Sequence, residues 1–286
     1  MIRRDDRVLP LTRVVAGVVV VILVLATWVL YLHPSETARH FAWTIKPSMT
    51  ALFMGAGYGS AVYFYARMVA VRRWHRVACG FIPTTIFTWL MLGATILHWS
   101  RFHHGQLAFE LWLWIYIVTP FLVPFVWLVN RRTDPGTLEE RDAPLPAAVR
   151  LALVVVGIGL CLVSAWLYLL PSSSAAHWPW TLTPLTSRVI ASFIAIPGVT
   201  WLMLAGDGRW SSCRIPLETT ALSILLMAAG TARAWSDLDH SNPLTWFIVA
   251  GMAVTLLAIG GLAVAMQRLA GARDAAPSIV PATPLP

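Results

Sequence analysis

Long apolar runs dominate this sequence and restrict what it can fold into. Eight of them are long enough to cross roughly 30 Å of hydrocarbon as helices. They lie at about 13–32, 50–71, 79–98, 109–129, 147–170, 185–204, 217–235 and 243–266. Of the 286 residues, 58% are hydrophobic and only 12% are charged, which excludes an ordinary soluble domain. The sequence therefore predicts an all-α, polytopic membrane protein with eight transmembrane helices.

The distribution of arginine predicts how these helices are oriented. Alternate connections carry fifteen arginines, whereas the opposite connections and the adjoining helix ends carry three to five arginines and lysines. Basic residues concentrate in cytoplasmic loops, so both termini are expected in the cytoplasm and the protein in the plasma (inner) membrane. The same rule explains the net charge of +8. We therefore expect the lipid bilayer, and no nucleic acid, as a partner.

One sequence motif occurs twice, 137 residues apart. Residues 31–35 and 40–47 read YLHPS and HFAWTIKP, and residues 168–172 and 177–184 read YLLPS and HWPWTLTP. Such self-similarity indicates an internal duplication, and an even number of helices per copy gives both copies the same orientation. We expect two parallel four-helix repeats at 13–130 and 149–268, a cytoplasmic N-terminus at 1–12, a cytoplasmic linker at 131–148 and a disordered cytoplasmic tail at 269–286.

The motif puts the same side chains into two loops at the outer face. They are His40, Trp43 and Thr44 in the first copy and His177, Trp180 and Thr181 in the second. Pockets between bundle helices combine apolar and aromatic groups with a few polar ones. We therefore expect these six residues to bind a lipid, a quinone or another small amphipathic ligand between the repeats. The alternative is structural: the tryptophans belong to an interfacial belt, and each threonine caps a helix whose first turn contains proline.

The histidines suggest a second chemistry at the same face. Seven of the eight histidines lie at the predicted outer face. Neutral imidazole is the commonest metal ligand, and duplicated loops could bring several of these rings together. The candidate metal ligands are His40, His177, His240 and Asp237. No short, regular spacing supports them, so the sequence requires no cofactor, and a metal ion or haem is an alternative.

Catalysis and transport are further alternatives. No nucleophile elbow is present, and Cys79 and Cys213 lie on the inner side, away from most histidines, so we assign no catalytic residue. A lipid-modifying enzyme with an outer His, Asp or Glu base remains an alternative. A small-solute transporter or channel is another, although no ionisable residue is expected at mid-bilayer. A homo-oligomer is compatible with the sequence.

One stretch resembles a known sequence pattern. FAWTIKP at 41–47, followed by MTA at 49–51 and GAGY at 55–58, is similar to a pattern of uncharacterised bacterial multi-pass membrane proteins, notably actinobacterial ones. The resemblance covers the first repeat, and it implies no activity or site residue, because that family has no assigned function. The second repeat departs from the pattern with WPWTLTP at 178–184.

Overall fold

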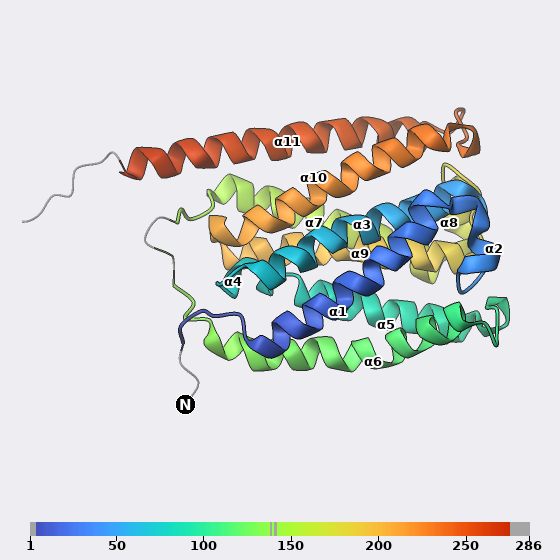
Figure 1. Ribbon diagram of the computed structural model, residues 1–286. Helices are drawn as coiled ribbons and strands as arrows, with labels where there is room; N and C mark the ends of the chain where they lie inside the picture. Colours follow the sequence, from blue (N-terminus) through green and yellow to red (C-terminus); the bar gives the residue numbers. More distant parts are fainter. Residues whose placement is uncertain (1–3, 138, 140–141, 275–286) are drawn as a thin grey trace, which may run out of the picture.

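The protein is a bundle of helices in the computed structural model, which describes residues 4–137, 139 and 142–274 (Figure 1). The long helices are α1 (Pro10–Thr27), α3 (Ser48–Ala70), α5 (Phe81–Leu97), α6 (Leu107–Asn130), α7 (Ala147–Leu169), α9 (Pro184–Asp207), α10 (Trp210–Arg233) and α11 (Pro243–Asp274). The connections contain the short helices α2 (Thr37–His40), α4 (His75–Ala78) and α8 (Pro171–His177). No β-strand occurs within the described ranges, where two isolated bridges join Arg7 to Arg73 and Pro144 to Arg209. The all-α prediction is confirmed.

Seven helical segments in the described chain are long and apolar enough to cross a membrane. They are Pro10–Leu32, His75–Leu97, Leu107–Thr133, Ala147–Leu169, Pro184–Asp207, Trp210–Arg233 and Pro243–Leu269. Their surfaces carry large exposed apolar side chains, such as Val14 on α1, Leu162 on α7 and Leu257 on α11. Such surfaces suit lipid, so the multi-pass membrane class predicted from the sequence is supported.

The eighth predicted run, 50–71, forms α3, which is not among those seven. At 23 residues α3 is long enough, but its sequence is less apolar and includes glycine, serine and tyrosine. Nearly half of its residues are buried. It packs against α1 and α10 and also touches α9. Because neighbouring helices cover much of α3, its surface need not be as apolar as that of a helix surrounded by lipid.

Close helix packing positions the centre of the bundle. Helix α9 packs against α7 and α5, α5 also packs against α6, and α11 runs along α10 at the edge of the bundle (Figure 1). Glycine allows two close approaches, one of α3 to the segment that follows α1 and one of α7 to α9. A Cβ on Gly55 would lie 2.7 Å from the Cβ of Tyr31, and one on Gly157 would lie 2.9 Å from the carbonyl oxygen of Gly198. Side chains at these positions would force the helices apart.

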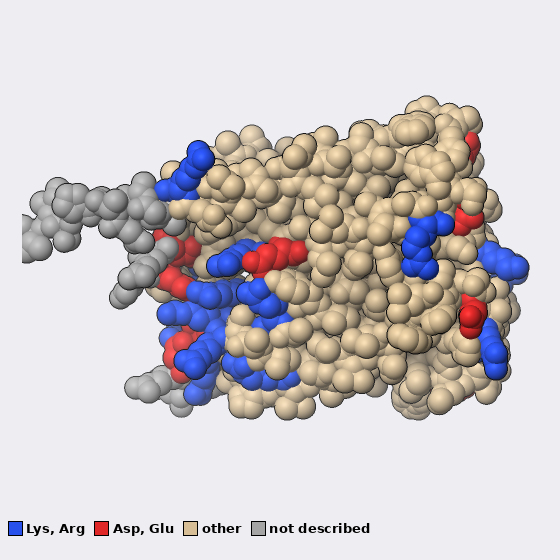
Figure 2. All heavy atoms as spheres, turned by 45° about the horizontal axis from the view of Figure 1, so that its top comes forward, with Lys and Arg blue, Asp and Glu red and all other residues tan. Residues whose placement is uncertain are grey.

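The two ends of the bundle differ in charge. The start of α1 and the end of α11 lie at one end, and α2 and α8 lie at the other (Figure 1). Basic and acidic side chains gather at the first end on the face shown in Figure 2, and we call it the arginine-rich end. Helix α11 continues through Asp274, into the segment 269–286 that was expected to be disordered. Residues 275–286 of that segment lie outside the described residues.

Candidate functional site

The tryptophans of the repeated motif are buried in two different aromatic clusters at the end opposite the arginine-rich end. Trp43 is 2% exposed, and its ring centroid lies 4.9 Å from those of Phe41 and Trp112. Trp180 is 5% exposed, packs 5.3 Å from Trp178 and donates its indole N–H to Thr50 Oγ1 at 2.9 Å. The indole N–H of Trp43 has no hydrogen-bond partner among the described residues.

Aromatic side chains fill the space between the two clusters. Phe53 on α3 packs 6.3 Å from Trp180 and 6.0 Å from Phe193 on α9, measured between ring centroids. Phe53 packs against both clusters. Side-chain packing therefore fills the described space between the tryptophans of the two motifs.

The polar members of the motif are exposed and have different partners in the two copies. His40 lies 3.4 Å from the Glu36 carboxylate, whereas His177 Nδ1 lies 2.9 Å from the Ser173 carbonyl oxygen. Thr44 Oγ1 lies 3.1 Å from a ring nitrogen of His103. The six predicted ligand residues thus contribute to loop structure rather than to one shared cluster.

The prediction that Thr44 and Thr181 cap the following helices is wrong, because other residues occupy the N-cap positions. Thr181 is exposed, and the N-cap of α9 is Thr183, which accepts a hydrogen bond from the Thr186 amide with Pro184 in the first turn. In the first copy Pro47 occupies the N-cap position, and the Met49 amide of α3 instead donates to Asp237 Oδ2 at 2.9 Å. The cap therefore comes from a different residue in each copy.

The four predicted metal ligands are not gathered into one site. Asp237 caps α3, and the exposed ring of His240 packs 4.8 Å from that of Trp235. Within the described ranges, the group of three or more histidine, cysteine and carboxylate side chains close enough to share a metal ion is Asp6, His75 and Glu139. It lies at the arginine-rich end, where the sequence analysis expected no site.

His75 is the centre of a buried ionic network. It is 1% exposed, its Nδ1 lies 2.5 Å from Asp6 Oδ2, and its Nε2 lies 3.1 Å from Glu139 Oε1 and 2.9 Å from Ser211 Oγ. Arg76 donates to both carboxylate oxygens of Glu139, at 3.0 and 2.8 Å. Burial would raise the pKa of Glu139, but the hydrogen bonds and charge of Arg76, with the charges of Arg73 and His75, hold it below its usual value.

This network resembles a serine nucleophile with its base, yet its hydrogen bonds serve structure. Asp6, His75 and Ser211 have the spacing of an aspartate, histidine and serine relay. However, the Ser211 hydroxyl donates to Asp142 Oδ2 at 2.5 Å, and the Ser211 amide donates to Asp142 Oδ1 at 3.0 Å. Both imidazole nitrogens lie next to carboxylates, and the Ser211 hydroxyl is engaged with Asp142 rather than free to act as a nucleophile. The arginines that already neutralise Glu139 also disfavour a metal ion here.

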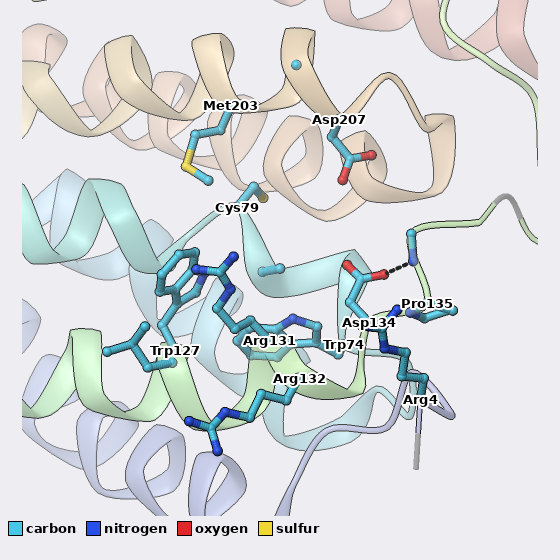
Figure 3. A pocket seen from close by; sticks show the side chains of 14 residues that line it. Arg4, Trp74, Cys79, Trp127, Arg131, Arg132, Asp134, Pro135, Met203 and Asp207 are labelled. Atoms are coloured by element: carbon cyan, nitrogen blue, oxygen red, sulfur yellow. Dashed lines mark hydrogen bonds between the residues drawn. The ribbon is translucent and has the colours of Figure 1, made fainter. Parts of the chain in front are cut away.

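A cavity of about 830 Å³ opens beside this network, and we call it the basic pocket (Figure 3). It lies where the ends of α6 and α9 meet α4 and the loop after α6. Its lining consists of Arg4, Trp74, Ala78, Cys79, Trp127, Leu128, Arg131, Arg132, Asp134, Pro135, Gly136, Met203, Gly206 and Asp207. Aromatic, thiol, thioether and aliphatic groups therefore share one cavity with charged groups.

Arg209 holds the acidic part of the pocket wall in place. It is 8% exposed and donates to Asp207 at 2.8 and 2.6 Å and to Asp134 at 3.2 and 3.1 Å. Burial would raise the pKa of Asp134, but hydrogen bonds from Arg209 and the Gly136 amide outweigh it and keep the pKa below its usual value. Burial alone would lower the pKa of Arg209, and the two carboxylates raise it instead. Arg209 therefore fixes the loop after α6 to the turn between α9 and α10.

A second pair of repeated patterns marks this region in the sequence. Asp6-x-x-Leu9-Pro10 recurs as Asp142-x-x-Leu145-Pro146, and Arg73-Trp74 recurs as Arg209-Trp210. In the structure each aspartate binds the residue after that tryptophan: Asp6 accepts from the His75 amide at 3.0 Å, as Asp142 does from the Ser211 amide. Comparison with protein-family models, with curated proteins and with solved structures finds no match to this chain.

Proposed function

We propose that the chain crosses the plasma membrane eight times, with α3 as the eighth span. A helix of 23 residues is about 34 Å long, which is enough to cross the hydrocarbon core. Its lower hydropathy is compatible with a membrane position, because α1, α9 and α10 shield it from lipid. The concentration of arginine at the end where the described termini lie supports cytoplasmic termini (Figure 2).

The eight helices form two parallel repeats in this proposal, and matched contacts support the pairing. Helices α1 and α3 pack together as α7 and α9 do, and α5 and α6 as α10 and α11 do. Between the copies, α3 packs on α10 and α9 packs on α5, which are equivalent contacts if the copies are exchanged. The bridge between Arg7 and Arg73 likewise corresponds to the bridge between Pro144 and Arg209. A pseudo-twofold axis along the membrane normal accounts for all of these pairs.

The function that the geometry supports best is non-enzymatic binding of a small amphipathic ligand, such as a lipid or quinone, in the basic pocket. One observation carries this proposal: the cavity joins charged groups, such as Arg131, to an apolar wall that includes Trp127 and Met203 (Figure 3). Ligand pockets of helical bundles combine these two kinds of surface. Leu128, at 49% exposure, continues the apolar wall to the lipid-facing surface of α6. The proposed site therefore lies at the opposite end from the one expected from the repeated motif.

A substitution that fills the pocket tests this function. A side chain on Gly206 would begin in open space, because no atom lies within 4 Å of a Cβ built there. Because Gly206 lines the cavity, Gly206→Trp adds a large side chain at its wall without a clash at the Cβ. Gly159 on α7 is exposed and equally open, so Gly159→Trp is the matched control.

The measurement is mass spectrometry of lipids and quinones that remain bound to the purified proteins. We expect a stoichiometric ligand in the wild type and in Gly159→Trp, and its loss in Gly206→Trp. Retention of the same ligand in Gly206→Trp, with unchanged stoichiometry, would contradict binding in this pocket.

A further inference from the structure

Three arginines that line the basic pocket have no charged partner among the described residues. Arg4, Arg131 and Arg132 form no ion pair and no side-chain hydrogen bond with any residue in the described part of the chain. Arg131 is held over the ring of Trp127, with its guanidinium carbon 4.4 Å from the ring centroid. This contact orients the guanidinium but leaves its N–H donors unused.

The acidic residues of the same wall do not compensate these charges. Asp134 and Asp207 are each bonded to Arg209, which lies behind them. Together with Arg209, the three arginines of the lining outnumber the two aspartates, so the wall keeps a net positive charge.

We propose that the ligand of the basic pocket is an anionic phospholipid, with its phosphate among the arginines of the lining and its chains along Trp127 and Leu128. This inference rests on the proposed function and names its ligand class. Guanidinium groups match phosphate with paired N–H donors, and Arg131 and Arg132 are consecutive in the short turn that follows α6. A lipid is favoured over a soluble phosphate because the apolar side of the pocket opens where Leu128 is exposed on α6. Anionic lipids are enriched on the cytoplasmic leaflet, the side that the arginines predict for this end.

The test compares two double variants that remove the same charge. Arg131→Gln/Arg132→Gln changes the pocket. Arg72→Gln/Arg268→Gln changes two exposed arginines that do not line the pocket. Binding of phosphatidylglycerol and of phosphatidylcholine to the detergent-solubilised protein is measured by native mass spectrometry, and inorganic phosphate is titrated as a separate probe.

We expect the wild type and the control variant to prefer phosphatidylglycerol. The pocket variant should bind it about 25-fold more weakly, since each interfacial arginine contributes roughly fivefold. Equal weakening in both variants, or no preference in the wild type, would overturn the anionic headgroup. Inorganic phosphate that binds as tightly as the lipid would overturn the lipid and make a soluble anion the ligand.

The proposed function fails separately from this inference. If phosphatidylcholine binds as well as phosphatidylglycerol and Gly206→Trp abolishes both, the pocket binds amphipathic molecules but the anionic specificity is wrong. If Gly206→Trp leaves the binding of both lipids unchanged, the pocket itself is not the binding site.

Discussion

Replacement of Arg209 by methionine tests whether the wall of the basic pocket depends on a buried ionic network. Arg209 is 8% exposed, and its guanidinium donates to both oxygens of Asp207 and of Asp134. Methionine would leave these carboxylates, which are 20% and 21% exposed, without that cation. Removing one partner of a buried ion pair costs about 3–5 kcal/mol. Because the aspartates keep some contact with water, we expect the lower limit, about 3 kcal/mol.

The assay is thermal unfolding of the detergent-solubilised protein followed by circular dichroism. A loss of about 3 kcal/mol corresponds to a fall in Tm of roughly 6–12 °C for a chain of this size class. Adding Asp134→Asn and Asp207→Asn to Arg209→Met removes the uncompensated charges. The amide oxygens can still accept from the Gly136 amide and the Ser212 hydroxyl, which now donate to Asp134 and Asp207. We therefore expect this triple variant to recover at least half of the lost Tm.

Two results would refute this reasoning. A loss below about 1 kcal/mol in Arg209→Met would show that the network behaves like an exposed salt bridge. A triple variant no more stable than Arg209→Met would show that the uncompensated carboxylates are not the cause of the loss. Arg209→Lys keeps the charge, but an ammonium group cannot bridge two carboxylates as a planar guanidinium does. Its Tm should therefore lie between those of the wild type and Arg209→Met.

Three further predictions follow from burial, packing and hydrogen bonding. Gly157→Ala should lower the free energy of unfolding by about 1–3 kcal/mol, because its Cβ would meet α9, whereas Gly159→Ala on the same helix should cost nothing measurable in thermal unfolding. Trp180→Phe should cost about 1 kcal/mol more than Trp43→Phe in the same assay, because only the first substitution removes an indole hydrogen bond; equal costs would contradict this. The lowered pKa of Asp134 stabilises the fold above about pH 4. This contribution is lost as the pH falls through the folded-state pKa. Asp134→Asn should therefore make the free energy of unfolding fall less steeply as the pH is lowered.

The helices could be predicted from the sequence because lipid imposes a simple rule. Each predicted run overlaps a helix, since an apolar segment in hydrocarbon must satisfy its backbone hydrogen bonds internally. The ends were less predictable: α4 precedes α5 as a separate turn, and α11 extends to Asp274. Of the eight long helices, only α3 is not apolar enough to be counted among the membrane-spanning segments. Its composition is set by contacts with neighbouring helices rather than by contact with lipid.

The site could not be predicted in the same way. Repetition of Trp43 as Trp180 predicts ligand binding, yet both rings are buried in aromatic packing, which would itself favour their repetition. The basic pocket joins residues that are far apart in the sequence, as the bond between Asp134 and Arg209 does. Membrane orientation is a sufficient explanation for the arginines in the sequence, so the binding role proposed for them had no separate signal.

A duplicated scaffold should offer two equivalent positions at the arginine-rich end, and the chain connectivity explains why they differ. Asp6 and Asp142 make the same backbone bond in the two copies, so the local frame is shared. The segment 131–137, however, connects the copies and therefore occurs once. It contributes much of the pocket wall and is held there by Arg209 of the second copy. Under the proposed duplication, the proposed binding site lies where the linker breaks the symmetry, and the repeated residues described above mainly maintain the fold.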